Sequence, residues 1–104
     1  MDESFIRTRI TQLRLQKGVS ESKMSTDMGH AKNYIRNITV GPTLPSVPEL
    51  LYMCEYLGVS ESEFFDAGNN YPALIADALE DMKKLNEQDL KYVVDLIKRL
   101  CNNN

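Results

Sequence analysis

The sequence predicts an all-α protein, in which five short helices form an N-terminal domain and two longer helices form a C-terminal hairpin. Apolar residues recur at intervals of three and four along most of the chain, which is the period of an amphipathic helix. Serine, asparagine and glycine stand where these periodic segments begin and end, as helix caps do. No segment alternates between apolar and polar residues as a strand does.

The composition is that of a small globular protein. The chain has 104 residues, of which 42% are hydrophobic, and this suits one compact domain with a short appendage. The N-terminus lacks the basic and then apolar order of a signal peptide, and no apolar run approaches the ~20 residues that span a bilayer. We therefore expect a cytoplasmic protein with no membrane partner.

The residue pattern contains no metal, cofactor or catalytic motif. The two cysteines, Cys54 and Cys101, form no CxxC pair, and His30 is the only histidine. There is no glycine-rich phosphate loop and no nucleophile motif. We expect no enzymatic activity, no cofactor and no small-molecule ligand, with Cys54 as a core residue.

Capping residues divide the first part of the chain into helices. We expect the first helix to start after Ser4 and to end at Gly18, and the second to start after Ser20 and to end at Gly29. A third helix is expected over residues 31–39, where the Gly-Pro pair that follows stops it.

Two further helices complete the N-terminal domain, which we place at residues 1–66. Ser46 with Glu49 and Ser60 with Glu63 have the spacing of capping boxes. In such a box each of the two side chains bonds the backbone N–H of the other residue, so that both free N–H groups are satisfied.

Residues 67–72 read as a linker, and residues 73–104 as a helical hairpin in which Asn86 caps the second helix. Each helix carries an apolar stripe, and a hairpin of this length cannot bury both stripes by itself. It either packs on the first five helices or pairs with another copy, and we favour a homodimer. The expected dimerisation residues are Leu79, Met82, Leu90, Val94 and Ile97.

Two short helices joined through a glycine have the spacing of a helix-turn-helix motif. The turn needs a left-handed residue, which Gly29 accepts without steric cost, and close approach of the helices needs a small side chain, which Ser25 provides. The second helix has to place apolar side chains on the core. The expected core of the motif is Met24, Ser25, Met28, Gly29, Ile35 and Ile38.

Three segments in order, IRTRITQLRLQKGVS, MSTDMGHAKNYIRNITVG and PSVPELLYMCEYLGVSESEFF, resemble the lambda-repressor-like, or Cro-type (XRE), helix-turn-helix transcriptional regulators. The resemblance covers roughly residues 5–65. It implies a five-helix domain whose helix over residues 31–39 enters the DNA major groove. The residues implied to contact bases are Lys32, Asn33, Arg36 and Asn37.

Charge is distributed as this function requires. Residues 1–41 carry seven basic and four acidic side chains, whereas residues 42–104 carry five basic and eleven acidic ones. Residues 29–41 contain no acid, which we attribute to the repulsion that a carboxylate in the groove would meet from phosphate. Candidate phosphate contacts are Ser20, Tyr34, Thr43 and Ser46, each of which also fits a plain cap, loop or packing role.

The chain departs from the family pattern at four places near the motif. Two of them are Ala31, which stands where a serine or threonine cap usually opens the recognition helix, and the loop GPTLPS, which is neutral where a basic loop is common. The other two are Glu21 and His30. Glu21 stands where members commonly carry a glutamine that touches phosphate and braces the recognition helix, and we expect its carboxylate to face DNA and to weaken binding. His30 stands where an apolar residue is usual. We expect a half-buried structural role for it rather than a phosphate contact.

The sequence thus favours a sequence-specific regulator of double-stranded DNA, acting as a repressor and bound as a homodimer to a palindromic operator. The alternative is a protein-interaction module with the same fold, whose partner is another regulator or a toxin and which binds DNA weakly or not at all. A non-specific architectural DNA binder is disfavoured because such proteins are strongly basic, whereas this chain has a net charge of −3.

Overall fold

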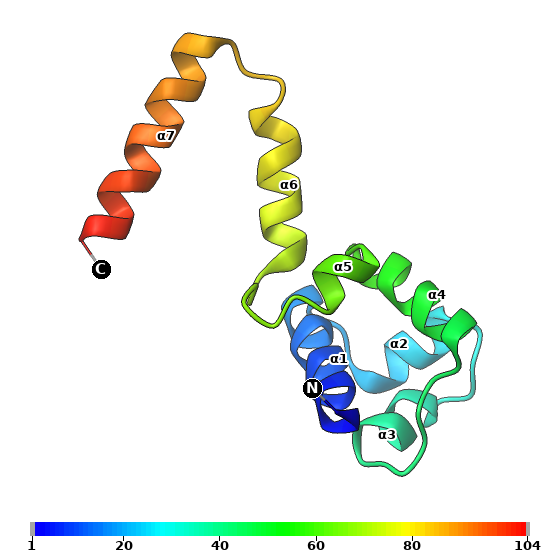
Figure 1. Ribbon diagram of the computed structural model, residues 1–104. Helices are drawn as coiled ribbons and strands as arrows, with labels where there is room; N and C mark the ends of the chain where they lie inside the picture. Colours follow the sequence, from blue (N-terminus) through cyan, green and yellow to red (C-terminus); the bar gives the residue numbers. More distant parts are fainter. Residues whose placement is uncertain (1, 104) are drawn as a thin grey trace. The chain divides into compact units, whose positions relative to one another are not determined.

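A computed structural model describes residues 2–103, and in them the chain is helical without strands. Figure 1 shows the helices in chain order. They are α1 (Glu3–Lys17), α2 (Glu21–Asp27), α3 (Tyr34–Thr39), α4 (Val47–Leu57), α5 (Glu61–Phe64), α6 (Pro72–Met82) and α7 (Glu87–Asn102). The chain divides into two compact units after Ala73, so that the first two residues of α6 belong to the N-terminal unit. No described helix is long and apolar enough to cross a membrane.

Side-chain caps start most of the helices, but not always as the sequence predicts. Asp2, not Ser4, is the N-cap of α1: its Oδ1 accepts from the backbone N–H of Ser4 at 2.9 Å. The prediction of Ser4 was wrong because the chain offers an aspartate two residues earlier, whose carboxylate also accepts from the Ser4 hydroxyl at 2.6 Å. These hydrogen bonds from Ser4 lower the pKa of Asp2.

Only one of the two expected capping boxes is complete in the described residues. Ser60 and Glu63 exchange both hydrogen bonds, at 3.1 and 2.9 Å. At α4, Ser46 accepts from the N–H of Glu49 at 3.3 Å, but the Glu49 carboxylate is bonded to His30 instead of returning the bond. A tertiary partner has therefore replaced the local one.

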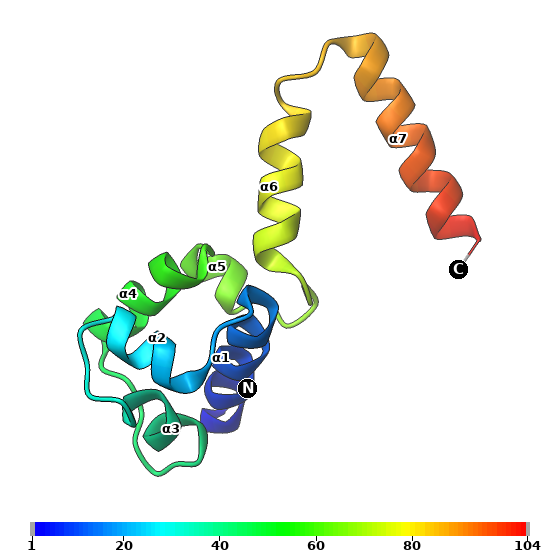
Figure 2. The same ribbon diagram turned by 180° about the vertical axis from the view of Figure 1, so that it is seen from behind.

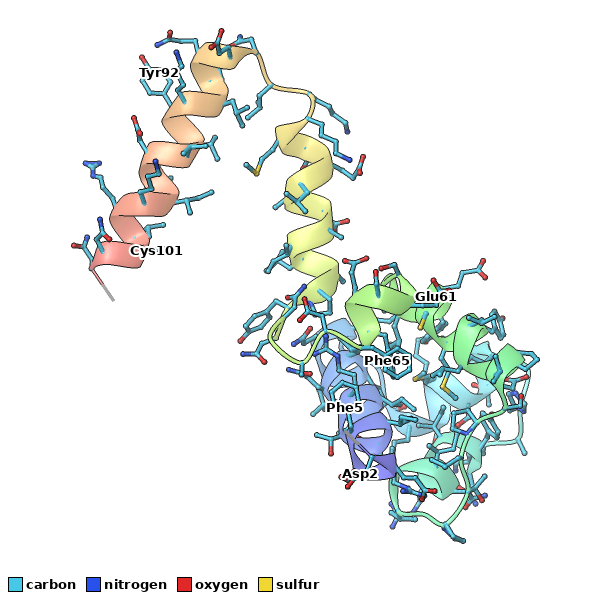
Figure 3. The ribbon with its side chains drawn as sticks, in the orientation of Figure 1. Asp2, Phe5, Glu61, Phe65, Tyr92 and Cys101 are labelled. Carbon is cyan, nitrogen blue, oxygen red and sulfur yellow. The ribbon has the colours of Figure 1, made fainter. Side chains whose placement is uncertain are left out.

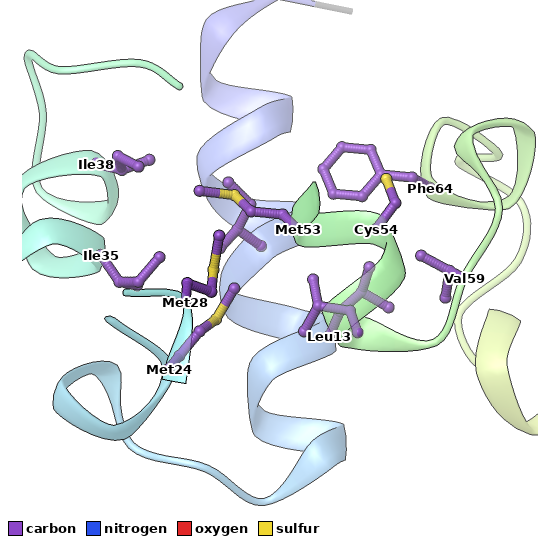
Figure 4. Close-up of a cluster of buried hydrophobic side chains, with 11 residues drawn as sticks. Leu13, Met24, Met28, Ile35, Ile38, Met53, Cys54, Val59 and Phe64 are labelled. Carbon is purple, nitrogen blue, oxygen red and sulfur yellow. The ribbon is translucent and has the colours of Figure 1, made fainter. Parts of the chain in front are cut away.

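The core of the N-terminal unit lies among its five helices. α3 packs against α1 and α2, while α4 packs against α1 and α5. Figure 4 shows buried side chains from these helices gathered into one cluster. Its members are Ile10, Leu13, Met24, Met28, Ile35, Ile38, Met53, Cys54, Leu57, Val59 and Phe64. Cys54 is buried as expected, and this burial raises the pKa of its thiol.

A buried arginine closes the C-terminal end of α5. Arg9 is only 3% exposed, and its guanidinium donates to the carbonyl oxygens of Phe64 and Glu63 at 2.8 Å and of Asp66 at 3.2 Å. A fourth donor reaches Gln12 Oε1 at 2.6 Å. Because a helix end leaves carbonyl groups without intrahelical partners, this single charge satisfies several of them at once.

A second arginine, Arg7, donates hydrogen bonds to carbonyl groups at and just after the C-terminal end of α3. Arg7 Nε donates to the carbonyl of Ile38 at 3.1 Å, and its Nη2 donates to that of Pro42 at 3.3 Å. The chain passes closely over this guanidinium at Gly41, which has φ +70° and whose missing Cβ would lie 3.4 Å from Arg7 Nε. Glycine suits this position because the backbone is left-handed there.

The C-terminal unit consists of the rest of α6, a turn and α7. Figures 1 and 2 show α6 and α7 diverging from the turn that joins them. Asn86 caps α7 as predicted, accepting from Asp89 N–H at 2.8 Å. No described residue of α7 is buried, and both helices expose large apolar side chains. Figure 3 shows the side chains of Tyr92 and Cys101 on α7, and both are exposed.

Candidate nucleic-acid interface

Helices α2 and α3 and the turn between them form a helix-turn-helix arrangement. Gly29 has φ +80°, the left-handed conformation that the turn requires, and its chain neighbour His30 donates its backbone N–H to Ser25 O at 2.9 Å. The apolar side chains of both helices face inward: Met24, Ile35 and Ile38 are fully buried. The apolar face of the motif thus packs on the core of the N-terminal unit.

A single buried hydroxyl joins the two helices. Ser25 is 0% exposed, and its Oγ donates to Glu21 O at 2.7 Å and accepts from Ile35 N–H at 3.0 Å. The second bond satisfies one of the free N–H groups at the start of α3. The sequence indicates a small residue here for close approach. It carries no signal for the hydroxyl bridge, because the partner N–H lies ten residues away.

The second helix of the motif is shorter than the sequence predicts. We expected it over residues 31–39, whereas α3 begins at Tyr34, and a turn closed by Tyr34 N–H bonding Ala31 O at 3.0 Å precedes it. Residue 31 has no capping side chain, and Asn33, which is the N-cap, makes no side-chain capping bond. Ala31 is exposed, so it does not share the buried face of Ile35 and Ile38.

The four side chains expected to contact bases are all exposed. Lys32 and Asn33 lie in the turn before α3, and Arg36 and Asn37 lie on α3 itself. Their arrangement is therefore a turn followed by a helix face, instead of one continuous helical stripe.

Three of the candidate phosphate contacts are helix caps or loop residues. The hydroxyls of Ser20 and Ser46 cap α2 and α4, accepting from Lys23 N–H at 3.0 Å and from Glu49 N–H at 3.3 Å. Thr43 is exposed in the loop between α3 and α4. Ser20, Ser46 and Thr43 thus have hydroxyls near helix ends or in a loop, where phosphate contacts are common.

The Tyr34 side chain packs within the fold. Its ring stacks on His30 with centroids 3.7 Å apart and planes 8° apart. Burial raises the pKa of the Tyr34 hydroxyl, and the nearby Glu49 carboxylate adds to this. His30 Nε2 in turn lies 2.8 Å from Glu49 Oε2, which ties the motif turn to the first turn of α4. The half-buried position of His30 is that of a structural residue.

Several of the basic side chains in the first 41 residues are used inside the fold. Arg7 and Arg9 bond the helix ends described above, and Arg14 Nη1 donates to Val19 O at 2.8 Å. The sequence analysis counts these arginines among the seven basic side chains of residues 1–41. No local signal distinguishes Arg7 and Arg9 from surface residues, since the backbone carbonyls that they bond lie 31 to 57 residues away.

Glu21 makes contacts that the sequence analysis does not anticipate. Its carboxylate turns to α3, where Oε2 accepts from Thr39 Oγ1 at 2.5 Å and Oε1 lies 3.7 Å from Arg36 Nη1. The last turn of α3 offers a hydroxyl and a cation to this side chain. That the Glu21 carboxylate weakens DNA binding stays a prediction. Glu21 is thus the one acid among the described residues that forms an ion pair with the candidate interface.

Comparison with known proteins assigns this arrangement to a family. A helix-turn-helix family model matches residues 10–64, which extend from the middle of α1 to the end of α5. No curated protein and no solved structure matches the chain. The match covers more than half of the chain. It includes the turn glycine, the buried faces of α2 and α3, and the exposed residues Lys32, Asn33, Arg36 and Asn37. The chain therefore belongs to the lambda-repressor-like (XRE) helix-turn-helix family of DNA-binding regulators.

Proposed function

We propose that this protein is a sequence-specific repressor that binds double-stranded DNA by placing α3 and the turn before it in the major groove. The observation that carries the proposal is the exposed set Lys32, Asn33, Arg36 and Asn37, which contains hydrogen-bond donors and no acid. The isoleucines of α3 are buried on the opposite side, so the polar face is turned outward.

The chemistry of these side chains suits base edges. Lysine and arginine donate to guanine O6 and N7, and asparagine pairs with adenine through N6 and N7. Arg36 and Asn37 extend from the helix, whereas Lys32 and Asn33 extend from the turn at its N-terminal end, the end that approaches bases in this motif. Ser20, Thr43 and Ser46 would contact phosphate and fix the register of the helix in the groove.

We propose further that the protein binds as a homodimer through the C-terminal unit. The apolar side chains of α6 and α7 are exposed, and a second copy of the same surface would cover them. Charge favours an antiparallel pairing of α7 with its copy: Glu87 and Asp89 lie at its start, and Lys98 and Arg99 at its end. The residues at the interface would be Leu79, Met82, Leu90, Val94 and Ile97.

In vitro selection from a random duplex pool at about 100 mM salt tests the proposal. We expect an enriched palindrome with half-sites about one helical turn apart, and an affinity that falls with salt at a slope of about −0.9 per phosphate contact. Lys32→Ala should weaken binding to the selected duplex. Lys83→Ala, which removes the same charge from the turn after α6, is the matched control. Enrichment of no sequence, or equal effects of the two variants, would refute the proposed interface.

A protein-interaction module is the second candidate, and Glu21 favours it because a carboxylate beside Arg36 reduces the positive potential of the surface. Under that reading the partner is another regulator or a toxin. The selection experiment separates the two candidates, since an interaction module, which binds DNA weakly or not at all, would enrich no palindromic sequence.

A further inference from the structure

Glu21 connects the first turn of α2 with the last turn of α3 by two contacts. Its Oε2 accepts a hydrogen bond from Thr39 Oγ1 at 2.5 Å, and its Oε1 lies 3.7 Å from Arg36 Nη1. The Glu21 side chain is 27% exposed, whereas that of Arg36 is 63% exposed. The carboxylate is therefore the fixed member of the pair, and the arginine extends from it towards solvent.

The backbone of Glu21 is held as well. Its carbonyl oxygen accepts from the buried Ser25 hydroxyl, which also binds the N–H of Ile35 at the start of α3. The same short segment of α2 is thus joined to both ends of α3. A shift of Glu21 relative to the recognition helix would break contacts at both ends.

We propose that Glu21 is a specificity-determining positioning residue, which orients the Arg36 guanidinium for one base pair of the operator. This inference rests on the proposed DNA-binding function and names the intramolecular device that sets its selectivity. Glu21 acts through Arg36 and touches no base itself.

The distance between the two groups is what makes this role possible. At 3.7 Å the pair attracts electrostatically, but it is longer than a hydrogen bond, so the donors of Arg36 are not consumed. Arginine presents five N–H donors in a rigid fork, and a guanine edge needs two of them. A free arginine loses much rotamer freedom on binding, whereas one already held by a carboxylate loses less.

The Glu21 carboxylate improves the discrimination between base pairs but lowers the affinity for DNA of any sequence. It adds a negative charge close to a surface that approaches phosphate, and it offsets part of the charge of Arg36. Glu21 should therefore lower the affinity for all DNA sequences while raising the discrimination at the base pair that Arg36 contacts. These two effects can be separated by measurement, because only the second depends on Thr39.

Three substitutions in the full chain form the test. Glu21→Gln removes the charge but keeps the shape and an acceptor for Thr39. Thr39→Val removes the anchoring hydroxyl but leaves every charge in place. Glu55→Gln removes one negative charge from an exposed position on α4 that forms no ion pair among the described residues, and it is the matched control. Each is also combined with Arg36→Ala.

The measurement is the affinity for the selected operator and for its three single-base variants at the position where Arg36→Ala abolishes preference. We expect Glu21→Gln to reduce the discrimination at that position about three- to ten-fold and to tighten binding to all four duplexes. Thr39→Val should reduce the discrimination about three-fold without tightening binding. Glu55→Gln should leave the discrimination unchanged, and none of the three should alter it further in the Arg36→Ala background.

The inference is overturned if Glu21→Gln and Thr39→Val leave the discrimination within two-fold of the parent protein, or if their effects persist without Arg36. An equal change at every position of the operator would also overturn it, because that result indicates a purely electrostatic role. If the parent protein enriches no DNA sequence, the proposed function itself fails and this inference with it. An enriched operator with unaltered selectivity refutes the role of Glu21 alone.

Discussion

Replacement of Ser25 by alanine tests whether one hydroxyl joins the two helices of the motif. The Ser25 side chain is fully buried, and its Oγ makes two hydrogen bonds, to Glu21 O at 2.7 Å and from Ile35 N–H at 3.0 Å. The substitution removes one atom, so the cavity term is small. The main consequence is a buried N–H group on Ile35 without a partner.

The size of the effect follows from the cost of that unpaired group. Leaving a buried donor unsatisfied costs about 1–3 kcal/mol, so we expect Ser25→Ala to lower the free energy of unfolding by about 2 kcal/mol. For a domain of this size that loss corresponds to a decrease in Tm of roughly 10 °C. Thr26→Ala is the matched control, because Thr26 Oγ1 bonds carbonyls of its own helix, at Ser22 and Lys23, and reaches no other element.

Urea unfolding followed by circular dichroism measures the difference, and amide hydrogen exchange locates it. The Ile35 amide should exchange faster in Ser25→Ala than in the parent protein, because the bond that protects it is gone. Thr26→Ala should stay within about 0.5 kcal/mol of the parent. If Ser25→Ala unfolds at the same urea concentration as the parent, the hydroxyl does not support the start of α3 and the reasoning is wrong.

Four further outcomes are expected, and urea unfolding measures the first two. Arg9→Met should destabilise the chain by about 2–4 kcal/mol in urea unfolding, because the carbonyls at the end of α5 lose charge-assisted hydrogen bonds; an unchanged midpoint would contradict this. Gly29→Ala should cost about 1–2 kcal/mol, entirely from the left-handed backbone, since nothing lies within 4 Å of the added Cβ. Burial and the hydrogen bond to Asp27 raise the pKa of Tyr56 to about 12, above the ordinary value of 10.0 that it regains on unfolding. The protonated Tyr56 hydroxyl therefore stabilises the fold fully below pH 10, and this stabilisation is lost as pH rises through 12. In thermal melting at different pH values, Tyr56→Phe should reduce the decrease in Tm between pH 10 and pH 12. In sedimentation velocity, Ile97→Asp should shift a dimer to monomer, whereas Tyr92→Asp on the opposite face of α7 should not; equal behaviour of the two would exclude the expected α7 face.

The helices were predictable because their signals are local. The 3.6-residue period of apolar side chains, the serines before α2, α4 and α5 and Asn86 before α7 all act within a few residues of the chain. The left-handed glycines are equally local, since only a residue without a Cβ adopts that backbone at no cost. These features were sufficient to place the helix-turn-helix motif and its buried face.

Helix ends were less predictable where two local signals competed or none was present. Asp2 replaced Ser4 as the cap of α1, and α3 started at Tyr34 because no capping side chain stands at residue 31. The capping box expected at Ser46 stayed incomplete because Glu49 found a partner in His30. At Asp2 and Glu49 the sequence contained the right residue types but did not determine which partner each side chain bonds, whereas at residue 31 it offered no capping side chain.

The candidate interface shows the same division between local and distant causes. The sequence alone determined that an acid-free segment with lysine, arginine and asparagine would follow the turn glycine, since composition and spacing are read directly from the chain. Only the tertiary structure decided that Arg7 and Arg9 serve helix ends, that Ser25 bridges α2 and α3, and that Glu21 turns to Thr39 and Arg36. The physical reason is that a polar side chain is satisfied by whichever donor or acceptor the fold brings within about 3 Å, and the fold brings together groups that are far apart in sequence.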